Sequence, residues 1–193
     1  MRFAVFATLF AYATIGLLQL VSASPILDTK DMVVKRDNSD IHTAVTSLKQ
    51  KIEPICAEID ELVKTKEITL DNVTPLLNDL KAVLDDAAAN HLKLARSALH
   101  KRQTDNEIAQ LIADLLEVIA NTLNGVLAAL GNIPALALLL AGIDASLAQV
   151  LIGLGILLAG VLNLVATLLV NVAALLRSLA FGLTLGALGL PAA

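Results

Sequence analysis

The sequence IHTAVTSLKQKIEPICAEIDEL, residues 41–62, carries apolar side chains at alternating steps of four and three residues. Such steps place these side chains on one stripe of an α-helix, where they can pack against a partner helix. Ser39 or Asp40 is suited to cap the start of this helix, and Pro54 predicts a kink or a short break near Glu53 because it removes one backbone donor. The stripe consists of Ile41, Val45, Leu48, Ile52, Ile55, Ile59 and Leu62.

A second stripe of the same spacing consists of Val73, Leu77, Leu80, Leu84, Ala87, His91, Leu94 and Ala98. Near its start, Thr74 and Pro75 form a pattern typical of an N-cap followed by a proline in the first helical turn. The link between the stripes, residues 66–72, is short and polar. We therefore expect two helices that pack antiparallel as a hairpin, within residues 37–102.

A third helix is predicted to begin at Thr104–Glu107, a capping-box pattern with acidic residues in the first turn. Gly131 and Pro134 predict that this helix stops and the next one begins there, since glycine favours the end of a helix and proline its first turn. The sequence therefore predicts an all-α protein, with the hairpin at 37–102 and a long, strongly apolar helical region at 103–193. The apolar positions of the third helix are Ile108, Leu111, Ile112, Leu115, Ile119 and Leu123.

Charge is divided unevenly along the chain. The whole sequence is 17% charged and 56% hydrophobic, but residues 118–193 carry only two charged side chains, Asp144 and Arg177. Between them, segment 145–176 would measure about 48 Å as one helix, which exceeds the hydrocarbon core of a bilayer, about 30 Å. By length and hydropathy this segment qualifies as a transmembrane helix. Glycines interrupt it, however, and it lacks flanking Lys/Arg clusters and Trp/Tyr belts.

Small and polar residues recur along the same segment at helical spacing, and two interpretations fit them. They mark a face where helices pack closely, or they face water while the rest of the helix meets oil, air or a hydrophobic solid. Exposed apolar surface of this extent causes aggregation in water, so the N-terminal helices, other copies of the chain, or a lipid or wall surface must cover it. The residues are Ser146, Gln149, Gly153, Gly160, Asn163, Thr167 and Asn171.

The first residues, 1–23, predict a secretory signal peptide. Arg2 supplies the basic start, an apolar run follows, and small residues precede a cleavage site between Ala23 and Ser24. Secretion permits disulfides, but Cys56 is the only cysteine, so no bridge can form within the chain. Cys56 is therefore either a small apolar core residue or the site of an intermolecular disulfide.

Two dibasic pairs divide the exported chain. Proteases of the kexin type cut after such pairs, because their acidic subsites bind two adjacent cations. Lys35 and Arg36 would end a short propeptide, residues 24–36. Lys101 and Arg102 lie between the hairpin and the apolar region, so a cut there would separate the two halves. The alternative for the second pair is a solvated helix end, where cations face the helix dipole.

The sequence lacks the patterns of catalytic, metal-binding and nucleotide-binding sites. His42, His91 and His100 are isolated from one another and have none of the spacings that zinc ligands use. The acidic runs at 58–61 and 85–86 fit solvated helix faces better than a catalytic pair. We therefore expect no enzyme activity, with no catalytic residue, no metal and no cofactor.

Two further features bear on modification and on partners. Asn72-Val73-Thr74 is a sequon for N-glycosylation, although Pro75 directly after it disfavours its use. A net charge of −4 without a block of like charges, together with 3% aromatic residues, argues against nucleic acid as a partner.

These features together resemble a known family. A signal peptide, a charged N-terminal half with paired dibasic sites, a very hydrophobic C-terminal half and the lack of a hydrophobin's eight cysteines look like the secreted non-hydrophobin structural protein of mushroom-forming fungi, found in the wall and extracellular matrix of aerial hyphae. The resemblance covers the whole chain and lies in architecture and composition rather than in a sharp motif. It implies a structural role: coating hyphae, helping them leave water and attaching them to hydrophobic surfaces. The hairpin pattern is also similar to the fungal hydrophobic-surface-binding cell-wall proteins, whose pattern stops well short of this C-terminal half.

We therefore expect a secreted, surface-active structural protein of the cell wall and extracellular matrix. Its apolar half is expected to adsorb and self-associate at hydrophobic surfaces or the air–water interface, with the charged half facing water, wall components or hydrophobins. Two other classes stay open. One is an integral membrane protein anchored by 145–176, and the other is a soluble bundle whose apolar helices enclose a lipid.

Overall fold

The computed structural model describes residues 39–97, 102–103 and 106–191. Within these ranges the chain forms seven helices and one pair of two-residue strands, which confirms the predicted all-α fold. The elements are α2 (Ser39–Thr65), α3 (Leu70–Ser97), β1 (Arg102–Gln103), α4 (Asn106–Leu130), α5 (Pro134–Leu157), β2 (Leu158–Ala159), α6 (Val161–Leu168), α7 (Ala173–Ser178) and α8 (Gly182–Ala187).

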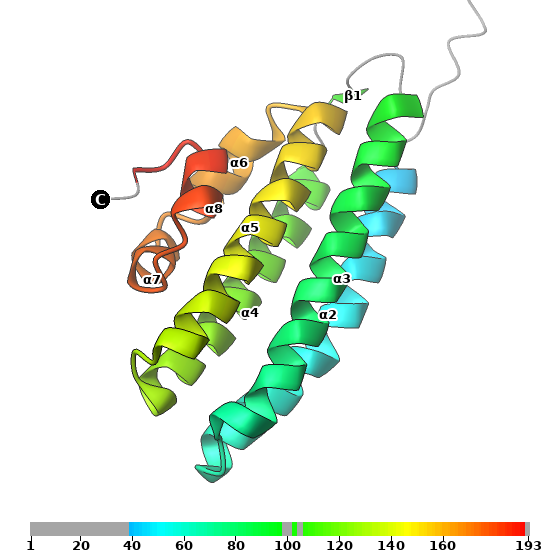
Figure 1. The fold of residues 1–193 in the computed structure, drawn as a ribbon. Helices are drawn as coiled ribbons and strands as arrows, with labels where there is room; N and C mark the ends of the chain where they lie inside the picture. The colour runs from blue at the N-terminus through cyan, green and yellow to red at the C-terminus, as the bar shows by residue number, and fades with distance from the viewer. Residues whose placement is uncertain (1–38, 98–101, 104–105, 192–193) are drawn as a thin grey trace, which may run out of the picture. The chain divides into compact units, whose positions relative to one another are not determined.

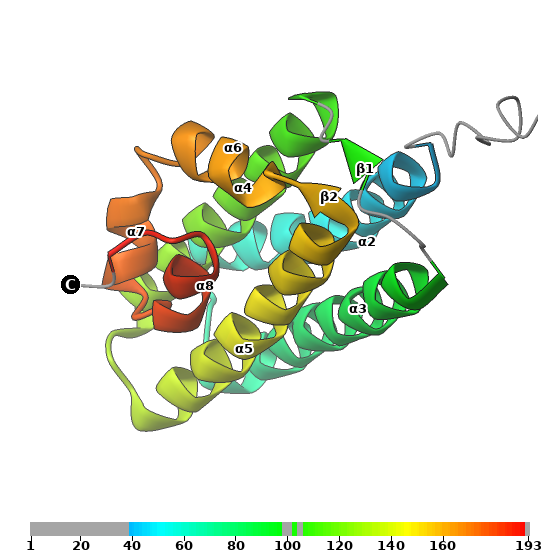
Figure 2. The ribbon, with the colours of Figure 1, turned by 90° about the horizontal axis from the view of Figure 1, so that it is seen from above.

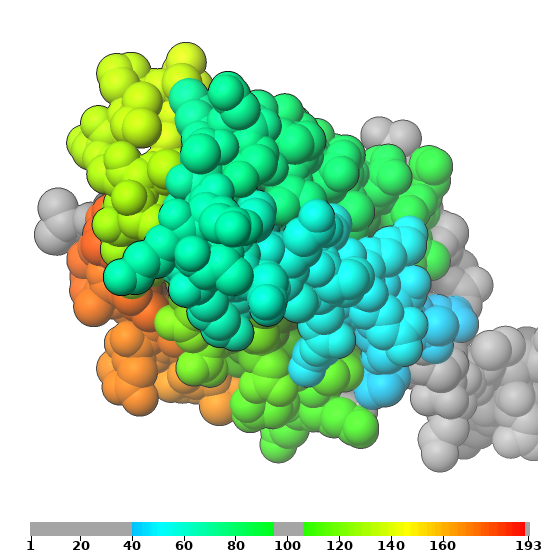
Figure 3. Space-filling model, turned by 90° about the horizontal axis from the view of Figure 1, so that it is seen from below, coloured from blue at the N-terminus to red at the C-terminus, as the bar shows by residue number. Residues whose placement is uncertain are grey.

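Helices α2 and α3 form the predicted antiparallel hairpin and lie side by side (Figures 1 and 3). The described residues of the two predicted stripes, which exclude Ala98, face the interior: Ile52 and Ile59 on α2 and Leu77 and Leu84 on α3 are at most 1% exposed. The opposite faces of both helices carry the charged side chains. The hairpin is thus held by packing along the two stripes, as their spacing predicts.

Helix α2 runs through Pro54 without a break, so the short break considered near Glu53 is wrong. Pro54 lies on the exposed face, while Ile52 and Cys56 beside it are buried in the core. Asp40 lies in the first turn of the helix, where a carboxylate interacts favourably with the helix dipole. The kink at Pro54 and the cap at Ser39 or Asp40 stay predictions.

The turn between α2 and α3 is closed by backbone hydrogen bonds. Lys66 adopts a left-handed conformation with φ of 60°. Its N–H donates to the Val63 carbonyl at 3.3 Å, and the Glu67 N–H donates to the Leu62 carbonyl at 3.2 Å. This pair of bonds is the Schellman arrangement, which usually has glycine at the left-handed position.

The start of α3 differs from the expectation of a cap at Thr74 with Pro75 in the first turn. The helix begins at Leu70, one turn earlier. The Thr69 N–H donates to Asn72 Oδ1 at 2.8 Å, and the Asn72 N–H donates to Thr69 Oγ1 at 3.3 Å. This reciprocal pair is a capping box, which satisfies two backbone donors at the start of the helix. Because the helix starts at this earlier cap, Pro75 lies inside it and not in its first turn.

The apolar helices α4 and α5 pack on the hairpin. Helix α4 lies against α2, and α5 lies against α3. The stop and restart predicted between them is confirmed: α4 ends at Leu130, Gly131 has a left-handed φ of 75°, and α5 begins at Pro134. Glycine adopts this φ without strain, so the chain can reverse direction there.

Segment 145–176 is not one continuous helix, so the single long span considered from its length is wrong, whereas the expected interruption by glycine occurs at Gly160. Helix α5 ends at Leu157, Gly160 takes a left-handed φ of 78°, and the chain continues as α6 and then α7. The left-handed residue redirects the backbone and so ends the helical run. The three short helices lie along α4 and α5, on the side away from the hairpin (Figures 1 and 2).

One apolar core joins the charged hairpin to the apolar region. It contains residues from α2 and α3 together with residues from every later helix, and Phe181, just before α8, is among its largest fully buried side chains. The hairpin thus covers one side of α4 and α5, and the short helices cover another.

Candidate functional site

Residues 134–191 expose several large apolar side chains, and we call the exposed part of these residues the C-terminal surface. Among the described residues, the large hydrophobic side chains that are exposed lie on this surface, with the exception of Leu92 on α3. Leu138 is 76% exposed and Val170 is 68% exposed. The exposed members of the C-terminal surface are Leu138, Ile152, Ile156, Leu164, Leu168, Val170 and Leu183.

The C-terminal surface is nearly without charge. Asp144 is only 4% exposed, so Arg177 is the one exposed charged side chain between 134 and 191. The Arg177 Nε–H donates to the backbone carbonyl of Pro191 at 3.0 Å. On the hairpin, by contrast, lysine, aspartate and glutamate side chains are exposed along both helices. The division of charge along the sequence is therefore also found among the exposed side chains of the hairpin and of residues 134–191.

Asp144 fixes α8 against α5. Its Oδ2 accepts the Leu183 N–H at 3.0 Å, and its Oδ1 accepts the Thr184 N–H at 2.9 Å. Both donors belong to the first turn of α8, where helix N–H groups have no partner within the helix. A carboxylate at the N-terminal end of a helix also interacts favourably with the helix dipole. Asp144 thus holds in place the helix that presents Leu183.

The stripe of small and polar residues is divided between two environments. Ser146 and Gly153 are buried between α5 and α3, which fits the interpretation of close helix packing. Gln149 on the same helix is exposed, as are the later members Gly160, Asn163, Thr167 and Asn171. The break after α5 separates the residues on α5 from the later ones, so the seven do not form one stripe.

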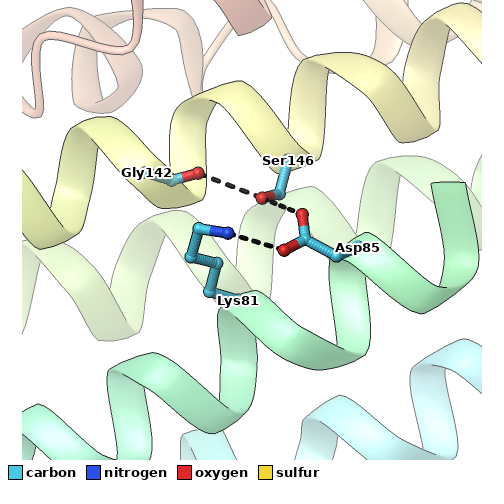
Figure 4. Close-up of polar contacts among 4 residues, drawn as sticks. All are labelled: Lys81, Asp85, Gly142 and Ser146. Carbon is cyan, nitrogen blue, oxygen red and sulfur yellow. Dashed lines mark hydrogen bonds and ion pairs between the residues drawn. The ribbon is translucent and has the colours of Figure 1, made fainter.

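A polar cluster joins the hairpin to the apolar region (Figure 4). Asp85 on α3 accepts the Lys81 Nζ–H at 2.6 Å and the Ser146 Oγ–H at 2.5 Å. These two hydrogen bonds lower the pKa of the Asp85 carboxyl, with Lys81 contributing most. The Lys81 side chain also lies across Gly142, where a Cβ atom would come within 3.3 Å of its Cε. The four groups connect the charged helix α3 with the apolar helix α5.

His91 lies in the same α3–α5 contact. It is 1% exposed, and its Nδ1 atom has no hydrogen-bond partner. Burial lowers the pKa of the imidazole, and a hydrogen bond to the Val150 backbone opposes this effect. A Cβ atom on Gly153 would come within 2.9 Å of the His91 Cβ. His91 is therefore a neutral packing residue at a point of close helix approach.

Cys56 is buried between α2 and α4. Burial raises the pKa of its thiol to about 11, against a smaller opposing effect of a hydrogen bond with Thr122. A thiol of this kind is not reactive at neutral pH. This placement fits the interpretation of Cys56 as a core residue, and the intermolecular disulfide stays a prediction that requires α2 and α4 to separate.

The remaining predicted positions lie apart from one another. The signal cleavage site at Ala23 and Ser24 and the pair Lys35–Arg36 lie outside the described residues, as does Lys101.

Arg102 lies in β1, which pairs in parallel with β2. Asn72 Nδ2 donates to the Glu67 carbonyl at 2.8 Å, so the sequon amide is part of the turn.

Two further findings concern ligands. In the described part of the chain, no group of three His, Cys, Asp or Glu side chains is placed to hold a metal ion. A recess of about 270 Å³ lies where the start of α5 meets the end of α7, and its lining includes Ala141 and Ala180 but no titratable side chain.

The sequence pattern does not identify the hydrogen-bond partners of Asp144 and Ser146. Their partners, Thr184 and Asp85, are 40 and 61 residues away along the chain. The isolation of Asp144 in an apolar stretch was a signal, because a buried carboxylate requires hydrogen-bond donors.

Comparison with protein-family models and with curated proteins finds no match for this sequence.

Proposed function

We propose that this chain is a secreted structural protein that adsorbs to hydrophobic boundaries through its C-terminal surface, and that it is not an enzyme. The observation that carries the proposal is the set of exposed leucine, isoleucine and valine side chains on a surface whose one exposed charge is Arg177. The hairpin, with its exposed charges, faces water or wall polysaccharide.

The physical basis is removal of apolar area from water. Burial contributes roughly 25 cal/mol per Å² of apolar surface, so side chains as exposed as Leu138 and Val170 favour adsorption. Exposed apolar patches on soluble proteins typically mark contact with another protein or with a membrane. Self-association through the same surface is favoured for the same reason, since it also removes apolar area from water.

The biological setting in this proposal follows from the resemblance in architecture. A secreted amphiphile of this kind would coat the fungal cell wall or extracellular matrix, support the formation of aerial hyphae and attach them to hydrophobic surfaces. Its partners would be the air–water interface or a hydrophobic solid, further copies of the chain, and wall components or hydrophobins.

The direct test places charges on the C-terminal surface. The triple variant Leu138→Asp, Val170→Asp, Leu183→Asp should adsorb much less to a polystyrene bead or an octyl-coated sensor than the unmodified protein, since each carboxylate must be desolvated on contact. The control has the same added charge on exposed hairpin positions: Ala57→Asp, Ala82→Asp and Ala89→Asp. Equal adsorption of both variants, at equal helix content by circular dichroism, contradicts the proposal.

A second candidate is an integral membrane protein. Helices α4 and α5 are each long and apolar enough to cross a bilayer. Half of the most apolar stretch of each is nevertheless buried within the chain, as in the core helices of a soluble protein. Extraction of expressing cells with sodium carbonate separates the candidates: retention in the membrane pellet supports an anchor, and recovery from medium or wall supports the secreted amphiphile.

A further inference from the structure

The predicted cut after Arg102 falls within a strand pair. The backbone of Arg102 pairs with Leu158, and Gln103 pairs with Ala159. Hydrolysis would break the Arg102–Gln103 peptide bond, with water adding a hydroxyl to the Arg102 carbonyl carbon and a proton to the Gln103 nitrogen. The products are a hairpin fragment, which ends at Arg102, and an apolar fragment, which begins at Gln103.

The contacts between these fragments extend along two pairs of long helices. Helix α2 packs on α4, and α3 packs on α5, through side chains of a single apolar core. On the hairpin side the fully buried side chains include Ile52 and Leu84, and on the other side Ile119 and Leu136. This burial resembles the interior of one domain rather than a contact between two independent domains.

Polar contacts at several points along the helices also join the two fragments. His42 Nε2 lies 3.5 Å from Glu107 Oε1, and Lys49 Nζ lies 3.9 Å from Asp114 Oδ2. The Ser146 hydroxyl donates to Asp85 at 2.5 Å. Each of these contacts joins side chains on opposite sides of the cut, and none needs the connecting chain.

We propose that the chain cut after Arg102 stays together as a non-covalent two-chain complex, in which the hairpin fragment remains the cover of α4 and α5. The expectation that a cut separates the halves is thereby changed: the cut removes the covalent connection and leaves the packing. We further infer that a hydrophobic surface replaces the hairpin fragment on the apolar fragment, and this second step rests on the proposed function.

The test uses the full-length secreted protein cut with a kexin-type protease. A variant with the recognition sequence of a site-specific viral protease inserted after Arg102 gives the same cut if the strand pairing shields the natural bond. Both fragments should elute together in native size-exclusion chromatography, with the mass of one complex, and separate in guanidinium chloride. Separation of the fragments in native buffer overturns the proposal.

Two glycine variants test whether the helix packing holds the complex. Gly153→Ala brings a Cβ within 2.9 Å of the His91 Cβ on α3, so the two helices must move apart. The matched control is Gly155→Ala, whose Cβ meets the flexible end of Leu162 within the same fragment. After the cut, Gly153→Ala should increase the fraction of free hairpin fragment, and Gly155→Ala should not. Equal effects of the two variants contradict the assignment of the interface.

The second step has its own measurement. When the cut complex is incubated with polystyrene beads, the apolar fragment should go to the beads and the hairpin fragment should stay in solution. If neither fragment binds, the proposed function fails while the two-chain complex stands. If both bind in equal amounts, the complex adsorbs without exchange and the second step is wrong.

Discussion

Thr184 is joined to Asp144 by two hydrogen bonds: its backbone N–H donates to Asp144 Oδ1 at 2.9 Å, and its hydroxyl donates to the Asp144 backbone carbonyl at 3.4 Å. Both residues are buried. The isolated acid in the apolar half thus connects α5 to α8, and its charge is matched by donors at a helix end instead of by a cation.

Replacing Asp144 by alanine should lower the free energy of unfolding by about 1–3 kcal/mol, because the N–H groups of Leu183 and Thr184 lose their acceptor. Urea unfolding followed by circular dichroism measures the loss. The control Asp79→Asn, at an exposed position of α3, should change the unfolding free energy by less than about 0.5 kcal/mol. An Asp144→Ala variant as stable as the unmodified protein would show that α8 is not held by this contact.

Lys66 offers a substitution that should stabilise the protein. Its φ of 60° is unfavourable for any residue with a Cβ atom, and glycine is the usual residue of such a turn. Lys66→Gly should therefore raise the unfolding free energy by about 1 kcal/mol. The same replacement at Lys64, inside the last turn of α2, should lower it by about 1 kcal/mol, since glycine is a poor helix former. Shifts of the same sign for both variants would contradict this account of the turn.

The elements that could be predicted from the sequence are those set by local spacing. The stripes on α2 and α3 and the turn from Gly131 to Pro134 follow from helical periodicity and from the preferences of glycine and proline. The glycines of 145–176 indicate an interruption, but hydropathy does not show that the break falls near Gly160 while Gly153 and Gly155 stay inside α5.

Contacts between distant segments were also beyond the sequence patterns. Nothing in the periodicity of α5 identifies Asp85 as the partner of Ser146, since the packing of α5 on α3 determines this pair. The exposed residues of the C-terminal surface could not be told from its core residues either. Leu138 and Leu140 are chemically the same, but one is 76% and the other 5% exposed. Which of the two leucines meets water depends on how the other helices pack against α5.

Acid should weaken the α3–α5 contact through His91. Burial lowers the pKa of folded His91 below 6.5, so the unfolded chain takes up the proton first as the pH falls. The contribution of neutral His91 to the free energy of unfolding is therefore complete above pH 6.5. It is lost as the pH falls from 6.5 through the pKa of His91 in the folded protein. Urea midpoints measured between about pH 7.5 and about pH 5, where carboxylates are still ionised, should therefore decline on the acid side. The decline should shrink in His91→Gln and persist in His42→Gln, a matched change at a partly exposed position of α2. A decline that is unchanged in His91→Gln would place the acid-sensitive group elsewhere in the chain.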